Sequence, residues 1–219
     1  LTGDLANVAG FTSQTFGQAG DTINLAANLT LARATIFAGG TNLLANVTLS
    51  GNANDITFAQ TVDGAFDLVV NTTGVTTFGG VVGGGAALNS LSTNPGGSTI
   101  LTGNVTTVGA QDYNDDVVLA ANVIATSTGN ADITFAGTVN GDLAANNRTL
   151  TINTTGVTTF TGNVGATQTL LSLATNAGGS TVVGGTVSTS GLLSFGDVLS
   201  FTGVGVKTLT AGDFTFGST

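Results

Sequence analysis

The side chains of this chain that could do chemistry are almost all aspartates. All twelve acidic residues are Asp, and the chain contains no His and no Cys. This composition excludes the Ser-His and Cys-His pairs of nucleophilic catalysis and the common zinc sites, because each of them needs imidazole or thiolate groups. What remains is carboxylate chemistry, namely calcium binding by clustered oxygens or acid–base catalysis by paired carboxylates.

The densest group of acids is DYNDD at 112–116, where Asp112, Asp115 and Asp116 could offer oxygens to Ca²⁺. The same acids could instead cap a corner of the chain and keep it solvated. Only one of the three returns in a related stretch 82 residues later, as Asp197. Calcium at these three aspartates is therefore the one cofactor that we consider, and we do not expect it to be a repeated site.

Paired carboxylates on a β-helical face can also cleave polysaccharides. Sites of that kind normally need basic or aromatic groups that hold the sugar. This chain has one Tyr, no Trp and three basic residues, Arg33, Arg148 and Lys207. We therefore predict that the chain is not an enzyme.

The net charge limits the possible partners. A formal charge of −9 and a pI near 4.1 argue against nucleic acid binding, which depends on basic groups that neutralise phosphates. The same charge argues against an electrostatic hold on anionic lipid. No stretch reaches the roughly 18 consecutive apolar residues of a membrane span, so we expect no membrane insertion.

The sequence around these acids consists of repeated stretches. The copied stretches are NTTGVTTF at 71–78 and 153–160, DITFAQTVDG at 55–64 with DITFAGTVNG at 132–141, and LNSLSTNPGGST at 88–99 with LLSLATNAGGST at 170–181. Their offsets of 77 and 82 residues define a unit of roughly 80 residues. The second copy carries five extra residues around 142–151, which we expect to form a surface loop.

A shorter period lies inside the long one. A bulky apolar residue followed four positions later by Val begins at residues 58, 78, 101, 113, 135, 160 and 183, at intervals of 20, 23, 12, 22, 25 and 23. The segments between these anchors are short, alternate apolar with polar residues and end in Gly or Asn. This pattern predicts an all-β fold without a substantial helix, in which about ten coils of about 20 residues stack as a β-solenoid.

The inward side chains of such a solenoid should stack in columns along its axis. We expect this of four Phe and four Val residues, which are Phe58, Phe78, Phe135 and Phe160 with Val62, Val82, Val139 and Val164. A pair of β-sandwiches or a barrel would also supply strands and turns, but would not explain an apolar anchor that returns every 20–23 residues.

No linker divides the chain, so we predict one solenoid domain over residues 1–219. The repeat is under way near the start and still running near the end, and neither end carries an evident polar cap. We expect a part of a longer repetitive chain. Its ends, LTGDLANVAGF at 1–11 and VKTLTAGDFTFGST at 206–219, should allow end-to-end self-association into filaments.

The stretches ITFAGTVNG, NTTGVTTFTGNVG, LSLATNAGGST and TTVGAQDYNDDVVLAANV resemble the repeats of long bacterial surface proteins of the filamentous-haemagglutinin-like or autotransporter type. The likeness covers roughly residues 40–200. It implies a right-handed parallel β-helix that is exported to the bacterial cell surface. The NPNL and NPNGI signatures of the two-partner secretion domain are missing, so the likeness points to the shaft of such a protein and leaves the export route open.

These observations favour an extracellular structural protein that forms a rod or fibre of a surface appendage, sheath, surface layer or matrix. One alternative is an adhesin whose face binds a cell-surface or matrix ligand. A second alternative is an ice-binding protein with Thr ladders, although TTF, TST and STS recur too irregularly for a flat array.

Overall fold

Short segments that alternate apolar residues with Thr, Ser or Asn form the strands of this protein, because successive side chains of a strand point to opposite faces. The computed structural model describes residues 13–217, and this range contains 27 strands of two to six residues. The only helical element among these residues is a 3₁₀ turn, η1 (Ala144–Asn146). The prediction of an all-β fold without a substantial helix is confirmed.

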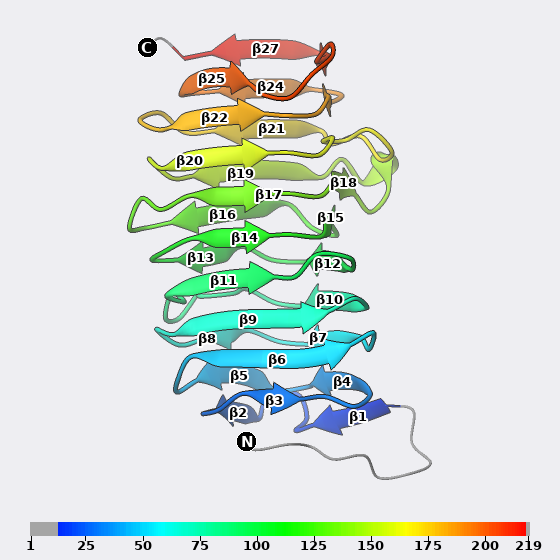
Figure 1. The fold of residues 1–219 in the computed structure, drawn as a ribbon, viewed down its shortest axis with the longest axis vertical. Coiled ribbons are helices and arrows are strands. Elements are labelled where there is room, and N and C mark those ends of the chain that lie inside the picture. Colours follow the sequence, from blue (N-terminus) through cyan, green and yellow to red (C-terminus); the bar gives the residue numbers. More distant parts are fainter. Residues whose placement is uncertain (1–12, 218–219) are drawn as a thin grey trace.

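The strands coil into a β-solenoid with three faces, and every named pair between coils is parallel. Figure 1 shows a right-handed coil that rises from the N-terminal to the C-terminal end, with the near strands running one way and the far strands the other. The predicted architecture of about ten stacked coils is therefore confirmed.

The strands divide among the three faces as follows. The first face holds β1 (Ser13–Phe16), β4 (Ala34–Phe37), β7 (Ile56–Phe58), β10 (Val75–Phe78), β12 (Ser98–Leu101), β15 (Asp116–Leu119), β18 (Val139–Gly141), β23 (Val187–Ser188) and β26 (Leu209–Thr210). The second face holds β2 (Thr22–Leu25), β5 (Gly40–Leu43), β8 (Val62–Asp63), β13 (Val105–Thr107), β16 (Val123–Ser127), β19 (Thr149–Asn153), β21 (Ser172–Thr175), β24 (Leu192–Phe195) and β27 (Asp213–Phe216). The third face holds β3 (Leu29–Thr30), β6 (Val47–Asn52), β9 (Asp67–Thr72), β11 (Ser90–Thr93), β14 (Gln111–Tyr113), β17 (Ile133–Phe135), β20 (Val157–Phe160), β22 (Ser180–Val183) and β25 (Val198–Phe201).

Two positions in this stack are held by isolated bridges instead of a strand. Val82 bridges Val62 and Val105 and so joins β8 to β13 on the second face. Val164 bridges Val139 and Val187 and joins β18 to β23 on the first face. The stack therefore continues past both interruptions.

Alternate residues of the strands point into the coil and stack on those of the next coil, because the pairing is parallel and in register. The predicted inward set of four Phe and four Val is confirmed, since none of the eight side chains is more than 1% exposed. The rings of Phe58 and Phe78 lie parallel with centroids 5.2 Å apart, and those of Phe135 and Phe160 are also 5.2 Å apart.

The aromatic column changes face twice along the molecule. The stacked rings are Phe16, Phe37, Phe58 and Phe78 on the first face, Tyr113, Phe135 and Phe160 on the third, and Phe195 and Phe216 on the second. Each change follows a 12-residue step between inward anchors, from Leu101 to Tyr113 and from Val183 to Phe195. The short interval of 12 residues therefore marks the place where the aromatic column moves from one face to another.

The long repeat is not a whole number of coils. The two copies of NTTGVTTF end in β10 and β20, which are ten labelled strands apart, and the bridge at Val82 adds one position. Ten plus one gives eleven strand positions, one fewer than the twelve that four coils of three strands would need. Each copy of the repeat is consequently turned by one face relative to the copy before it, so that β10 lies on the first face and β20 on the third.

The stacked Phe column should contribute strongly to stability. Truncating the buried Phe160 to Ala removes ring contacts on β20, and we expect it to lower the free energy of unfolding by about 3–5 kcal/mol. The matched control is Thr159→Ala in the same strand, whose side chain points outwards and should change stability by about 0.5 kcal/mol or less. Chemical denaturation followed by circular dichroism measures both, and equal effects of the two substitutions would contradict the inward column.

Candidate functional site

The structure places the three aspartates of DYNDD in different surroundings. Asp112 lies in β14 and points outwards from the third face, Asp115 is buried in the corner before β15, and Asp116 is exposed at the start of β15. Asp116 accepts hydrogen bonds from the backbone N–H and the hydroxyl of Thr138 in the next coil, at 2.7 and 2.9 Å. Within residues 13–217 no group of three or more His, Cys, Asp or Glu side chains could hold a metal ion. Calcium at these aspartates stays a prediction.

Asp115 binds the coil beneath it. The hydroxyls of Thr93 and Thr99 each donate a hydrogen bond of 2.9 Å to Oδ1 of its carboxylate. Burial raises the pKa of Asp115 above its ordinary value of 3.8, and the two hydroxyl donors oppose part of that rise. The side chain therefore acts as an internal clamp at the corner between the third and first faces.

The same clamp is built a second time around Asp197. The hydroxyls of Thr175 and Thr181 donate to Oδ1 of this aspartate at 3.0 and 2.8 Å, and all three residues lie 82 positions after their counterparts. Asp197 Oδ2 is buried and has no hydrogen-bond partner in the described part of the chain. The acid that returns in the repeat is thus the inward, clamping one, and this return was the signal in the sequence for its structural role.

Exposed asparagines directly before a strand, or before the bridge at Val164, also link successive coils. In each case the side-chain carbonyl accepts a backbone N–H of the following coil at 2.8–3.1 Å. The pairs are Asn28 with Thr48, Asn46 with Asp67, Asn104 with Ile124, Asn122 with Thr149, and Asn163 with Thr186. These amides satisfy N–H groups that the sheets leave free at the corners.

One buried polar pair was not foreseen from the sequence. Gln111 and Tyr113 are both fully buried, and the Tyr113 hydroxyl donates to Gln111 Oε1 at 3.0 Å. The amide of Gln111 donates in turn to Thr107 Oγ1 and to the carbonyl of Thr126, at 3.2 and 3.0 Å. Burial, followed by the charge of Asp115, raises the pKa of Tyr113 well above its usual range. The pair lies where the aromatic column passes to the third face.

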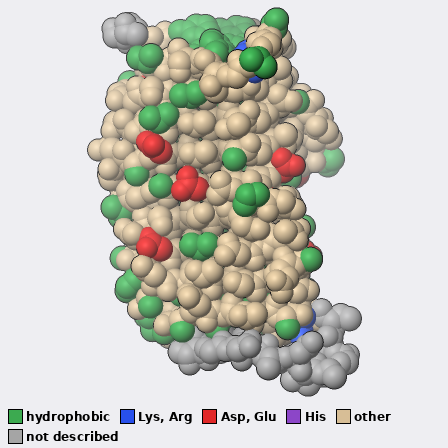
Figure 2. Space-filling model, in the orientation of Figure 1, with side chains coloured by type: hydrophobic (Ala, Val, Ile, Leu, Met, Phe, Trp, Pro, Cys, Tyr) green, Lys and Arg blue, Asp and Glu red, His purple; other side chains and the backbone are tan. Residues whose placement is uncertain are grey.

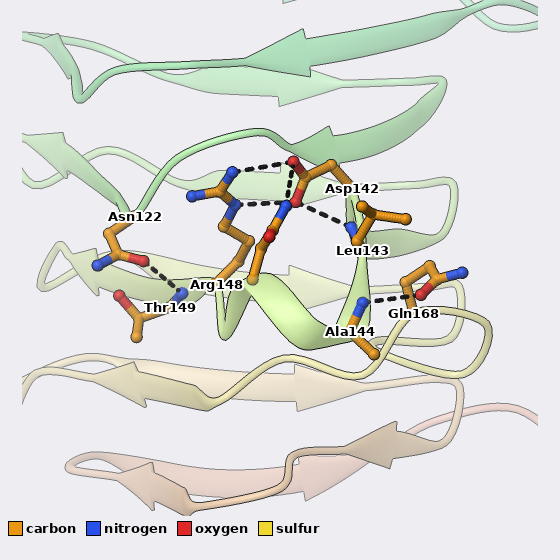
Figure 3. A network of polar contacts seen from close by, with 8 residues as sticks. Asn122, Asp142, Leu143, Ala144, Arg148, Thr149 and Gln168 are labelled. Carbon is orange, nitrogen blue, oxygen red and sulfur yellow. Dashed lines mark hydrogen bonds and ion pairs between the residues drawn. The ribbon is translucent and has the colours of Figure 1, made fainter.

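The five extra residues form the predicted surface loop, and a small polar network fixes it (Figure 3). Arg148 donates two hydrogen bonds to the carboxylate of Asp142, from Nε at 2.8 Å and from Nη2 at 2.9 Å. The amide of Asn146 and the backbone N–H of Leu143 donate to the same carboxylate, each at 2.9 Å. The Arg148 guanidinium holds the pKa of Asp142 well below its usual range.

A shallow hollow of about 400 Å³ lies beside this loop on the first face, lined by Asp116, Thr138, Asn140, Asp142 and Gln168 among others. Its walls combine hydroxyls, amides and carboxylates with the side chains of Val117 and Val118, and they contain no aromatic ring, so the hollow offers hydrogen bonds but no platform for a sugar. Several of these groups already serve the fold, since Asn140 Oδ1 accepts the backbone N–H groups of Thr167 and Gln168 at 3.0 and 3.2 Å.

The lateral surface is sparsely charged. Figure 2 shows one side of the molecule, on which uncharged polar side chains and backbone dominate and the few acidic side chains lie apart. No helix in the described range is long and apolar enough to cross a membrane.

Removal of calcium tests the role of the DYNDD aspartates. Because Asp115 and Asp116 already accept hydrogen bonds from Thr side chains, we expect EDTA to leave the melting temperature unchanged. The measurement is thermal unfolding with EDTA and with added Ca²⁺. A loss of several degrees in EDTA that Ca²⁺ reverses would establish a bound ion.

The two kinds of aspartate should respond to pH with opposite sign. The raised pKa of Asp115 means that its contribution to stability is complete below about pH 3.8 and is lost as the pH rises through the folded-state pKa. Relative to an Asp115→Asn variant, the wild-type protein should therefore gain melting temperature on acidification. The lowered pKa of Asp142 predicts the reverse relative to Asp142→Asn, because that contribution is lost as the pH falls. Parallel melting curves for the variants and the wild type would contradict both assignments.

Comparison of the chain with protein-family models, with curated proteins and with solved structures found no significant match, so the likeness to bacterial repeat proteins stays a prediction and the β-solenoid is what the molecule itself establishes.

Proposed function

We propose that this chain is a structural element of an extracellular rod or fibre, the shaft of a bacterial surface appendage, sheath or matrix. The observation that carries the proposal is the use of its polar side chains. Asp115, Asp197 and the corner asparagines all bind a neighbouring coil, so the groups that could serve a ligand serve the stack. The polar contacts of such a molecule join one coil to the next along a single axis.

The distribution of apolar side chains supports the same role. The inward rows consist mainly of Val, Leu, Ile and Phe, with buried Thr and Gln111 among them, and the hydrophobic core runs from Ile23 to Phe195. Stability in such a stack is the sum of contributions from each coil and its neighbours. A shaft of this kind resists bending because each coil is held on all three faces.

An adhesin is the second candidate, and the loop around η1 with its adjoining hollow favours it. This loop breaks the regular surface of the rod and exposes Leu143 by 57%, so it is the most distinctive feature that a partner could contact. Ice binding receives less support. The outward row of the first face, Thr15, Ile36, Thr57, Thr77, Ile100, Val118 and Asn140, mixes residue types where a Thr array would be needed.

Electron microscopy and fibre diffraction of the purified protein test the structural role. We expect elongated particles of constant width with an axial spacing of about 4.8 Å between coils. The companion assay measures binding to polysaccharides and matrix proteins, with thermal hysteresis as the arm for ice. Saturable binding of one ligand that is lost when residues 143–147 are replaced by a Gly-Ser turn would favour the adhesin instead.

A further inference from the structure

The hollow beside the η1 loop lies where the stack of the first face is interrupted. Strand β18 ends its sheet, and Val164 forms an isolated bridge where neighbouring coils have a strand. Residues 165–169 cross this part of the face without forming a strand, and the hollow of about 400 Å³ is lined from both segments. Its volume falls in the range of roughly 300–1,000 Å³ that is typical of small-molecule sites.

The first copy of the repeat contains the equivalent place. Strand β8 ends its sheet there, and Val82 forms the isolated bridge. Asp63 Oδ1 accepts the backbone N–H groups of Gly85 and Ala86, at 2.7 and 3.1 Å. Asn140 Oδ1 holds the turn of the second copy in the same way. The backbone of this corner is therefore built alike in both copies.

The side chains on this backbone differ between the copies. Four polar residues of the second copy line the hollow where the first copy has glycine, alanine or no residue. They are Thr167 for Gly85, Gln168 for Ala86, Asp116 for Gly40 at the first position of β15 and β5, and Asp142 in the loop that carries the extra residues. Because the first copy forms its corner without these side chains, the fold does not require them.

The hollow presents free hydrogen-bonding groups of both kinds. Asp116 Oδ1 accepts two hydrogen bonds from Thr138, whereas Oδ2 has no partner in the described part of the chain. Gln168 uses Oε1 to accept a backbone N–H of the η1 loop (Figure 3), so its Nε2 group remains as a donor. The hydroxyls of Ser98 and Thr167 also lie on the wall, without a partner among residues 13–217.

The charges of the hollow favour an uncharged ligand. Asp142 is neutralised by the two hydrogen bonds that it accepts from the Arg148 guanidinium, so Asp116 supplies the one unpaired charge among the lining residues. An anion would be repelled by this carboxylate, and a cation would meet the N–H donors of Gln168. A hydroxyl group fits both, because it donates and accepts.

We infer that this hollow binds an uncharged, hydroxyl-rich ligand, such as one sugar residue of a surrounding polysaccharide. The ligand donates to Asp116 Oδ2 and accepts from Gln168 Nε2, while the hydroxyls of Ser98 and Thr167 do either. Because no aromatic ring covers a sugar face, the ligand is held by its hydroxyl edge alone, and binding is weak and tolerates different sugars. The inference goes beyond the proposed structural role, which needs no ligand, and gives the side of a rod a contact with a polysaccharide matrix.

The test is a titration of ¹⁵N-labelled protein with glucose, galactose or mannitol, followed by NMR spectroscopy. The reporters are the backbone amide of residue 168 and the side-chain amide of Asn140. We expect saturable shifts with dissociation constants on the order of 1–10 mM, because about four hydrogen bonds give a weak complex. Ethylammonium and acetate, at matched ionic strength, should leave both signals unchanged.

The variant Thr167→Gly/Gln168→Ala gives this turn the residues of the first copy, which hold the same backbone. It should weaken sugar binding by about tenfold or more, since two of the free groups are removed. Gln60→Ala, at an exposed glutamine of the first copy outside the hollow, is the matched control and should bind like the wild type.

Three results would overturn the inference. They are the absence of saturable shifts at about 100 mM sugar, saturation by ethylammonium or acetate instead, and sugar binding that the double variant leaves unchanged. Circular dichroism checks folding, and Asp116→Asn is the second variant. It keeps Oδ1 for Thr138 but replaces the free acceptor by a donor, so it should also weaken binding.

The outcomes separate this inference from the structural role. Elongated particles that bind none of the sugars overturn the hollow as a site and leave the shaft intact. Particles that are not elongated count against the shaft, whether or not the sugars bind. Binding of one sugar alone, weakened by the same variants, supports the hollow as a site and favours the adhesin.

Discussion

Every feature of this molecule depends on one requirement, which is that the backbone N–H and C=O groups of each coil find partners in the coils above and below. A strand of two to six residues cannot satisfy them within its own coil, so the coils must stack in parallel at the strand spacing of about 4.8 Å. Parallel pairing in register then places like positions over one another. The columns of Phe and Val follow from this geometry, and so do the asparagine carbonyls that receive the N–H groups left over at the corners.

The same requirement explains the close approach of backbone at the corners. Gly83 and Gly165, 82 residues apart, both have a positive φ, and a Cβ at either position would collide with a carbonyl oxygen of the next coil. Glycine is needed there because it alone combines that conformation with that contact. These two residues follow Val82 and Val164, which form isolated bridges where neighbouring coils have strands. The missing strand and the tight turn at glycine therefore occur together, once in each copy of the repeat.

The sequence was sufficient to predict the coil, its length and the inward side chains, because buried Phe and Val return at a nearly constant interval. It did not predict on which face each column lies. The interval of 12 residues shows that the column is interrupted, but it does not show to which face the next aromatic residue moves. The second such interval, from Val183 to Phe195, falls outside the sequence pattern, because Leu199 stands where the pattern has Val. The burial of Gln111 was not predicted, because a polar residue in a strand is normally expected to point outwards. Only the structure shows its hydrogen bond with the buried Tyr113. Among the acids, the return of Asp197 separated the clamp from its exposed neighbours, although only the structure shows Thr175 and Thr181 beneath it.

The turn by one face per repeat has a consequence for anything that meets this molecule from outside. Copies of the same motif do not form a straight line along the rod but follow a spiral around it. The first NTTGVTTF stretch spans the third and first faces, and the second stretch spans the second and third faces. Three repeats of eleven strand positions make 33 positions, or eleven whole coils, and this is the length after which a motif would return to its starting face. A flat substrate such as a mineral can therefore touch only one of the two copies in this chain, whereas a partner that winds around the rod can contact both in succession.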